Sequence, residues 1–61
     1  MNVKKTKETY LITDPPDSKV QLNIDFKENN FEVMRMHVET GSTIVEFAEE
    51  MAVEALKKNQ V

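Results

Sequence analysis

The chain has 61 residues, no cysteine, one histidine and a net charge of −3, from 11 acidic and 8 basic side chains. A chain this short forms one domain, residues 1–61, and buries only about 60% of the surface that its unfolded form exposes. This composition excludes disulfides and the common zinc sites, so we expect a partner to supply stability, most simply a second copy in a homodimer.

The N-terminal part of the chain is basic and then becomes strand-like. We expect residues 1–6 to form a flexible basic N-terminus, and we predict a first strand from Lys7 to Thr13. The strand must stop before Asp14-Pro15-Pro16-Asp17-Ser18, because proline fixes φ and lacks the backbone donor of a strand. Antiparallel pairing across this connection brings apolar residues together, with Ile12 facing Val20 and Tyr10 facing Leu22.

The segment Lys19–Lys27 alternates strictly between polar and apolar residues, which indicates a strand with one buried face. Glu28-Asn29-Asn30 then predicts a three-residue hairpin loop with Asn30 at positive φ. In the resulting register, Val20 faces Val38, Leu22 faces Met36 and Ile24 faces Met34. This register places Met34 and Met36 in the core and leaves Phe31 and Val33 on the outer face of the third strand.

Residues from Thr43 to Lys58 predict a helix, with Thr43 and Glu46 in the pattern of a capping box. Its apolar residues recur at helical spacing and cover about half of the circumference. They are Ile44, Val45, Phe47, Ala48, Met51, Ala52, Ala55 and Leu56. The predicted fold is therefore α+β, a three-stranded antiparallel meander followed by one C-terminal amphipathic helix packed on one sheet face.

The sequence offers no recognisable catalytic or cofactor site. His37, the single histidine, is predicted on the outer face of the third strand, with no nucleophile or pocket beside it. A single glycine cannot supply a phosphate-binding loop, and Asp14 and Asp17 are separated by two prolines rather than spaced as calcium ligands. We therefore expect neither catalysis nor a bound metal or cofactor.

Two sets of residues are candidates for binding a partner. The first consists of apolar side chains that the predicted core does not accommodate, namely Leu11, Phe31, Val33 and Val53. Exposed apolar residues next to a sheet edge are typical of an interface. The second set is acidic and follows one helix face at i, i+4 spacing, namely Glu46, Glu50 and Glu54.

These features predict a small cytoplasmic, non-enzymatic protein-interaction module that forms a homodimer. A membrane partner is not expected, because the chain has no apolar run of about 18 residues. One alternative is a single-stranded nucleic-acid-binding protein. The order of strands and a terminal helix is similar to the dimeric single-strand binders of the transcriptional-coactivator type, but those use basic grooves and this chain is acidic. The other alternative is a viral or mobile-element inhibitor that presents its acidic helix to a basic partner surface.

Overall fold

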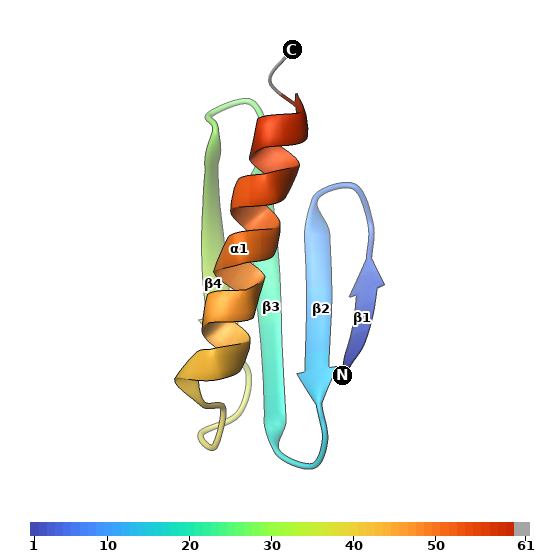
Figure 1. Cartoon of the computed structure of the whole chain (residues 1–61), viewed down its shortest axis with the longest axis vertical. Coiled ribbons are helices and arrows are strands. Elements are labelled where there is room, and N and C mark those ends of the chain that lie inside the picture. The colour runs from blue at the N-terminus through green and yellow to red at the C-terminus, as the bar shows by residue number, and fades with distance from the viewer. Residues whose placement is uncertain (60–61) are drawn as a thin grey trace.

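The computed structural model describes residues 1–59 and contains four strands followed by one helix (Figure 1). The elements are β1 (Asn2–Lys5), β2 (Thr9–Asp14), β3 (Ser18–Asp25), β4 (Asn30–Arg35) and α1 (Ser42–Asn59). The strands form one antiparallel sheet in the order β1-β2-β3-β4. The predicted α+β class, antiparallel meander and C-terminal helix are confirmed, but the sheet has four strands rather than three.

The additional strand, β1, lies in the basic segment 1–6 that was expected to be flexible. Val3 pairs with Ile12 and Lys5 pairs with Tyr10. A tight turn joins β1 to β2, in which the backbone N–H of Thr6 donates to the carbonyl of Thr9 over 2.9 Å. The Thr6 hydroxyl also accepts from the backbone N–H of Thr9. These bonds close the hairpin, so the strand predicted from residue 7 begins at Thr9.

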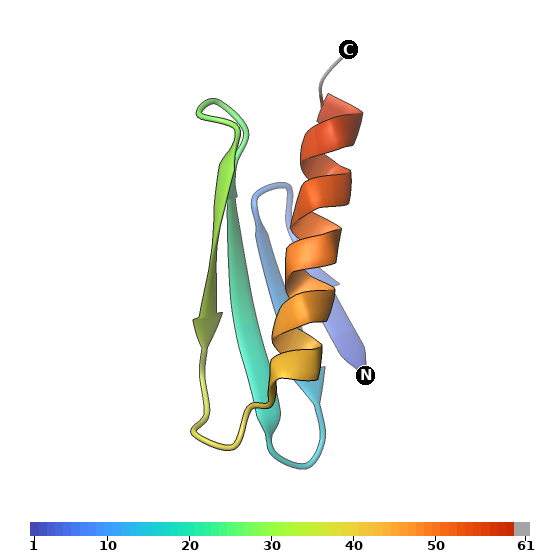
Figure 2. The same cartoon turned by 60° about the vertical axis from the view of Figure 1, so that its left-hand side comes forward.

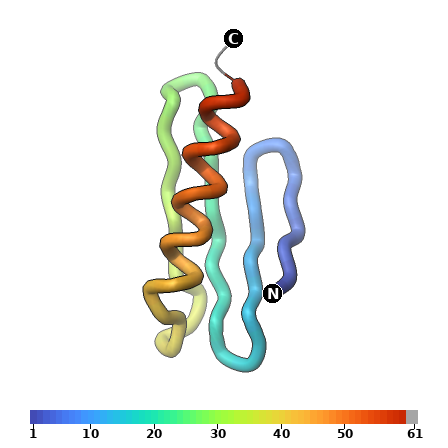
Figure 3. The backbone as a smooth tube through the Cα atoms, in the orientation of Figure 1, coloured from blue at the N-terminus to red at the C-terminus, as the bar shows by residue number. Residues whose placement is uncertain are grey.

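The connection between β2 and β3 has the predicted register but is shorter than predicted, because Asp14 and Ser18 belong to the strands and pair with each other. Strand β2 ends at Asp14 and β3 begins at Ser18, with the two prolines in the turn and a cis bond between Pro15 and Pro16. The predicted pairs Ile12–Val20, Tyr10–Leu22 and Thr13–Lys19 are all present. Figure 3 shows the chain reversing direction at this turn and at the β3–β4 turn at the opposite end of the sheet.

The β3–β4 register was predicted wrongly, by three residues. Ile24 pairs with Phe31 rather than with Met34. The turn begins earlier than expected because the Asp25 carboxylate accepts hydrogen bonds from the backbone N–H groups of residues 27 and 28, at 3.1 and 3.0 Å. Asn29, and not the predicted Asn30, has positive φ, at 58°. A shift by an odd number of residues exchanges the two faces of the strand.

The exchange of faces changes which β4 residues reach the core. Phe31 and Val33 point to the helix side and pack against the core, whereas Met34 and Met36 are each 43% exposed. This arrangement also places Glu32 opposite Asn23 on the outer face. The observed register buries an aromatic and a β-branched side chain and leaves the Glu32 carboxylate in solvent. It is the more stable register, because burying an unpaired carboxylate is unfavourable.

Helix α1 packs on one face of the sheet, here called the inner face, and the two form two layers (Figure 2). It begins at Ser42, one residue before the predicted cap. The fully or almost fully buried apolar residues come from β2, β3 and the helix, and are Ile12, Val20, Leu22, Ile24, Ile44, Ala48, Ala52 and Leu56. Every helix residue predicted to face the sheet is in this core or packs against it.

The β4–α1 connection is anchored by Thr40, a polar residue that is only 4% exposed. Its hydroxyl accepts from the backbone N–H of Lys19 over 3.2 Å and donates to the Lys19 carbonyl over 3.3 Å. The Met36 N–H donates to the same carbonyl. These contacts attach the loop to the first residues of β3 and thereby fix where α1 begins.

Candidate interaction surface

The inner face of the sheet is covered unevenly. Helix α1 lies against β3, β4 and β2, whereas no Cα atom in it lies within 8 Å of one in β1. The exposed fractions of three cross-strand neighbours, Val3, Ile12 and Val20, show the same difference between β1 and the strands under the helix. Ile12 and Val20 are fully buried, but Val3 is 37% exposed. The β1 side of the sheet therefore has an inner face that the helix of the same chain leaves open (Figure 1).

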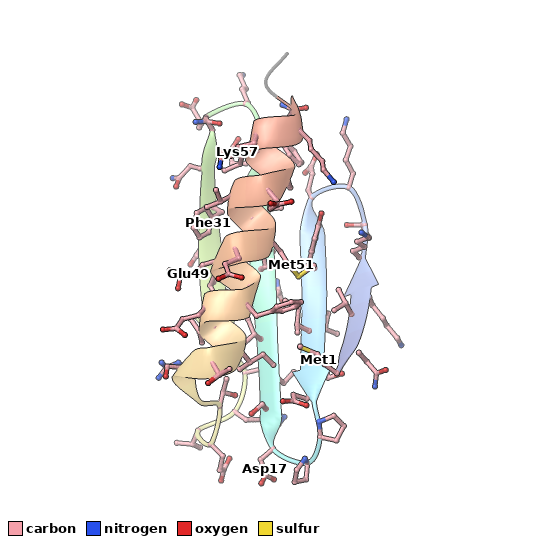
Figure 4. All side chains as sticks on the ribbon, in the orientation of Figure 1. Met1, Asp17, Phe31, Glu49, Met51 and Lys57 are labelled. Carbon is pink, nitrogen blue, oxygen red and sulfur yellow. The ribbon has the colours of Figure 1, made fainter. Side chains whose placement is uncertain are left out.

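Apolar side chains gather where this open region meets the helix. Val3 comes from β1 and Tyr10 from β2, and their alternation places both on the inner face. Phe47 and Met51 come from the helix, are only partly buried, and line an open hollow together with Tyr10. Figure 4 shows Met51 reaching from α1 toward β2 and Met1 lying beside β2. We call the surface formed by Met1, Val3, Lys5, Tyr10, Phe47 and Met51 the α1–β1 groove.

The two rims of the groove carry opposite charge. On the β1 side, the Lys5 ammonium lies 5.6 Å from the centre of the Tyr10 ring, within the range of a cation–π interaction. On the helix side, Glu46, Glu50 and Glu54 line the same wide hollow together with Lys58, and all four are exposed. At i, i+4 spacing these acids form one continuous row, here called the acidic stripe. The groove is thus apolar along its floor, with Lys5 on the β1 rim and a mainly acidic helix rim that ends in Lys58.

The structure brings together only two of the four predicted apolar interface residues, since Phe31 and Val53 line the same open hollow as Tyr10 and Phe47. Phe31 and Val33, expected on the outer face, lie on the inner face and pack against the core. Leu11 is on the outer face, half-buried, opposite Gln21. Val53 is 42% exposed on the helix. The predicted outer-face position of Phe31 and Val33 is therefore wrong, because the register shift moved both to the other side of the sheet, and their role in an interface stays a prediction.

Sequence reasoning missed the residues that do form the groove. Tyr10, Phe47 and Met51 were assigned to the core and pack against it, but their remaining surface faces the region that α1 leaves open. Val3 and Lys5 were assigned to a flexible terminus. The signal that could have located them is the alternation of Met1, Val3 and Lys5, followed by Thr6 and Thr9 at the spacing of a two-residue hairpin.

The outer face of the sheet is more polar than the inner face. The Gln21 side-chain amide donates to the Asn23 side-chain oxygen over 3.1 Å, and the Asn23 amide approaches the Met34 sulfur at 4.0 Å. His37, predicted on this face, instead lies exposed in the β4–α1 connection, where its backbone carbonyl accepts from Thr40. The predicted third strand therefore ends at Arg35, before the histidine.

Within residues 1–59, no group of three or more histidine, cysteine, aspartate or glutamate side chains is placed to hold a metal ion. Over the same range, every buried side-chain nitrogen or oxygen has a hydrogen-bond partner. The α1–β1 groove is consequently the feature of the described chain that most resembles a binding surface, since it combines partly exposed apolar groups with charged rims.

Comparison of the chain with protein-family models, with curated proteins and with solved structures finds no match. The one helix in the described part of the chain, α1, is not both long and apolar enough to cross a lipid bilayer.

Proposed function

We propose that this protein is a small, non-enzymatic interaction module that binds another polypeptide in the α1–β1 groove. The observation that carries the proposal is the incomplete cover of the inner face: α1 reaches β2, β3 and β4 but not β1. Met1 and Val3 are 61% and 37% exposed, so a partner that covers them removes apolar surface from water.

The composition of the groove supports binding to a protein. Aromatic side chains and methionine are enriched in protein interfaces, and Tyr10, Phe47 and Met51 supply them here. The charged rims, Lys5 on one side and the acidic stripe on the other, would orient the bound chain by pairing with charges on its surface. We expect the partner's apolar groups to lie between these rims.

A second candidate function follows from the exposure of the acidic stripe. Glu46, Glu50 and Glu54 could instead bind a basic surface of a target, as an inhibitor that occupies a nucleic-acid groove would. Changing all three to glutamine would weaken such binding and reduce its salt dependence. If the chain bound single-stranded nucleic acid, the same substitutions would strengthen binding, because they would remove repulsion from the phosphates.

The experiment compares two substitutions of the same chemical kind. Val3→Glu places a carboxylate in the groove, and Val38→Glu places one at a residue that is 97% exposed in the β4–α1 connection. Tagged wild-type and variant proteins are incubated with native lysate and with an untagged copy, and retained polypeptides are identified by mass spectrometry. We expect Val3→Glu to lose the retained polypeptide and Val38→Glu to keep it.

Equal retention by the two variants would exclude the groove as the binding surface. Recovery of nucleic acid in place of a polypeptide would favour the single-strand binding function. Circular dichroism of both variants at the same concentration distinguishes lost binding from lost folding.

A further inference from the structure

The charges around the α1–β1 groove are complementary to each other within one molecule. Lys5 lies on the β1 rim, and Lys7 lies in the turn that follows, whereas Lys4 pairs with Leu11 on the outer face. The acidic stripe lies on the helix rim. A partner that satisfies both rims needs an acidic surface and a basic surface separated by an apolar strip, and this chain itself has that pattern.

The open part of the inner face consists of β1 and the partly exposed side of Tyr10 on β2, because Ile12 of β2 is already fully buried. Each copy has one described helix, 18 residues long, whose flank carries Phe47 and Met51. In a face-to-face pair, this flank of each helix would contact β1 and Tyr10 of the other copy.

We propose that the α1–β1 groove binds a second copy of this chain in a two-fold dimer, with the acidic stripe of each copy against Lys5 of the other. This inference rests on the proposed function and names the partner. A two-fold interface uses the same surface of both copies, so each contact occurs twice. The two Lys5–stripe contacts flank a centre formed by Tyr10 and Met51 from both copies. Because the contacts are reciprocal, reversing the charge of one residue disrupts both of them.

The test uses charge reversal at Lys5 and at Glu50, the middle residue of the stripe. Lys5→Glu would place two acids together at each contact, and Glu50→Lys would place two bases together. We expect wild type to be a dimer in sedimentation equilibrium, and each single variant to have a dissociation constant raised about tenfold or more, because like charges facing each other disfavour association. Lys27→Glu, which changes an exposed lysine in the β3–β4 turn, is the matched control and should leave the dissociation constant unchanged.

Two further samples identify the partner as a second copy. In an equimolar mixture of Lys5→Glu and Glu50→Lys, both contacts of the mixed dimer join opposite charges, so association should return. The double variant, Lys5→Glu with Glu50→Lys, should also return to a dimer. A different partner protein, whose charges have not been exchanged, would not bind the double variant better than the single ones. The wild-type dissociation constant should also rise with salt.

Three outcomes would overturn the proposal. Wild type that is folded and monomeric at about millimolar concentration would exclude self-association. A dimer that neither single variant weakens would place the interface outside the groove. Weakening by both single variants without recovery in the mixture or the double variant would exclude reciprocal pairing. The Val3→Glu and Val38→Glu comparison in lysate still tests the groove in each case, so failure of the dimer and failure of the proposed function are distinguishable.

Discussion

Strands β3 and β1 belong to one sheet and both direct alternate side chains toward the inner face, but their surroundings differ. Val20, Leu22 and Ile24 of β3 lie beneath α1 and are at most 4% exposed. Val3 and Lys5 of β1 remain at the surface. Hydrogen bonding between strands is therefore not what separates these two regions. The position of the single helix decides which strands form a core and which present a surface.

The difference also separates stability from binding. The free energy of folding should be concentrated where α1, β2 and β3 meet, because apolar burial is the dominant favourable contribution. The β1 side contributes less to the folded chain and keeps apolar surface available to a partner. Three substitution pairs test this division, starting with the largest expected effect.

The first pair consists of cross-strand neighbours, Ile12 under the helix and Val3 on β1. Ile12→Ala should lower the free energy of unfolding by about 2–5 kcal/mol, because it leaves a cavity among fully packed neighbours. Val3→Ala should cost less than about 1 kcal/mol in the monomer, since Val3 is partly exposed and its neighbours can relax. Urea unfolding at low protein concentration measures both losses of stability. Equal losses would contradict the division between a stabilising region under the helix and a binding region on β1.

The same pair sharpens the comparison when protein concentration is raised. If a second copy covers Val3, the cost of Val3→Ala should increase with concentration, because the substitution then also weakens the dimer. The cost of Ile12→Ala should change much less.

The second pair tests the anchor that holds α1 over β3. Thr40→Val removes the hydroxyl that bonds both the N–H and the carbonyl of Lys19, at nearly constant volume. We expect a loss of about 1–3 kcal/mol, because the backbone donor left behind is partly buried. Thr13→Val, on the outer face of β2, is the control and should change stability by less than about 0.5 kcal/mol. Thermal unfolding of the two variants provides the measurement. If Thr40→Val left the stability unchanged, the anchor would not be what positions the helix.

The third pair tests which face of β4 turns toward the helix. Val33→Lys should destabilise the protein by about 1–3 kcal/mol, because it places an ammonium group against the core. Met34→Lys, one residue along, should cost less than about 0.5 kcal/mol at a side chain that is already 43% exposed. Chemical denaturation of both proteins compares them, and a reversed order would support the register predicted from the sequence alone.

The sequence by itself determined the elements whose pattern is long and regular. Alternation from Lys19 predicted β3, and helical spacing from Ile44 to Leu56 predicted α1 to within one residue at its start. The β2–β3 register also followed from sequence, because the two prolines restrict the turn and the pairing that this short turn allows joins apolar with apolar. These features depend on local chemistry or on neighbouring residues.

Tertiary structure decided the β3–β4 register, the fourth strand and the groove. Both faces of β4 carry apolar side chains, so alternation could not choose between them. Hydrogen bonds to the Asp25 carboxylate and the positive φ of Asn29 fix the turn. Packing against the core stabilises the register in which Phe31 and Val33 face the helix. Strand β1 has only four residues and gains its order by pairing with β2. The groove exists because one helix cannot cover four strands, a limit of size that appears only when the elements are packed together.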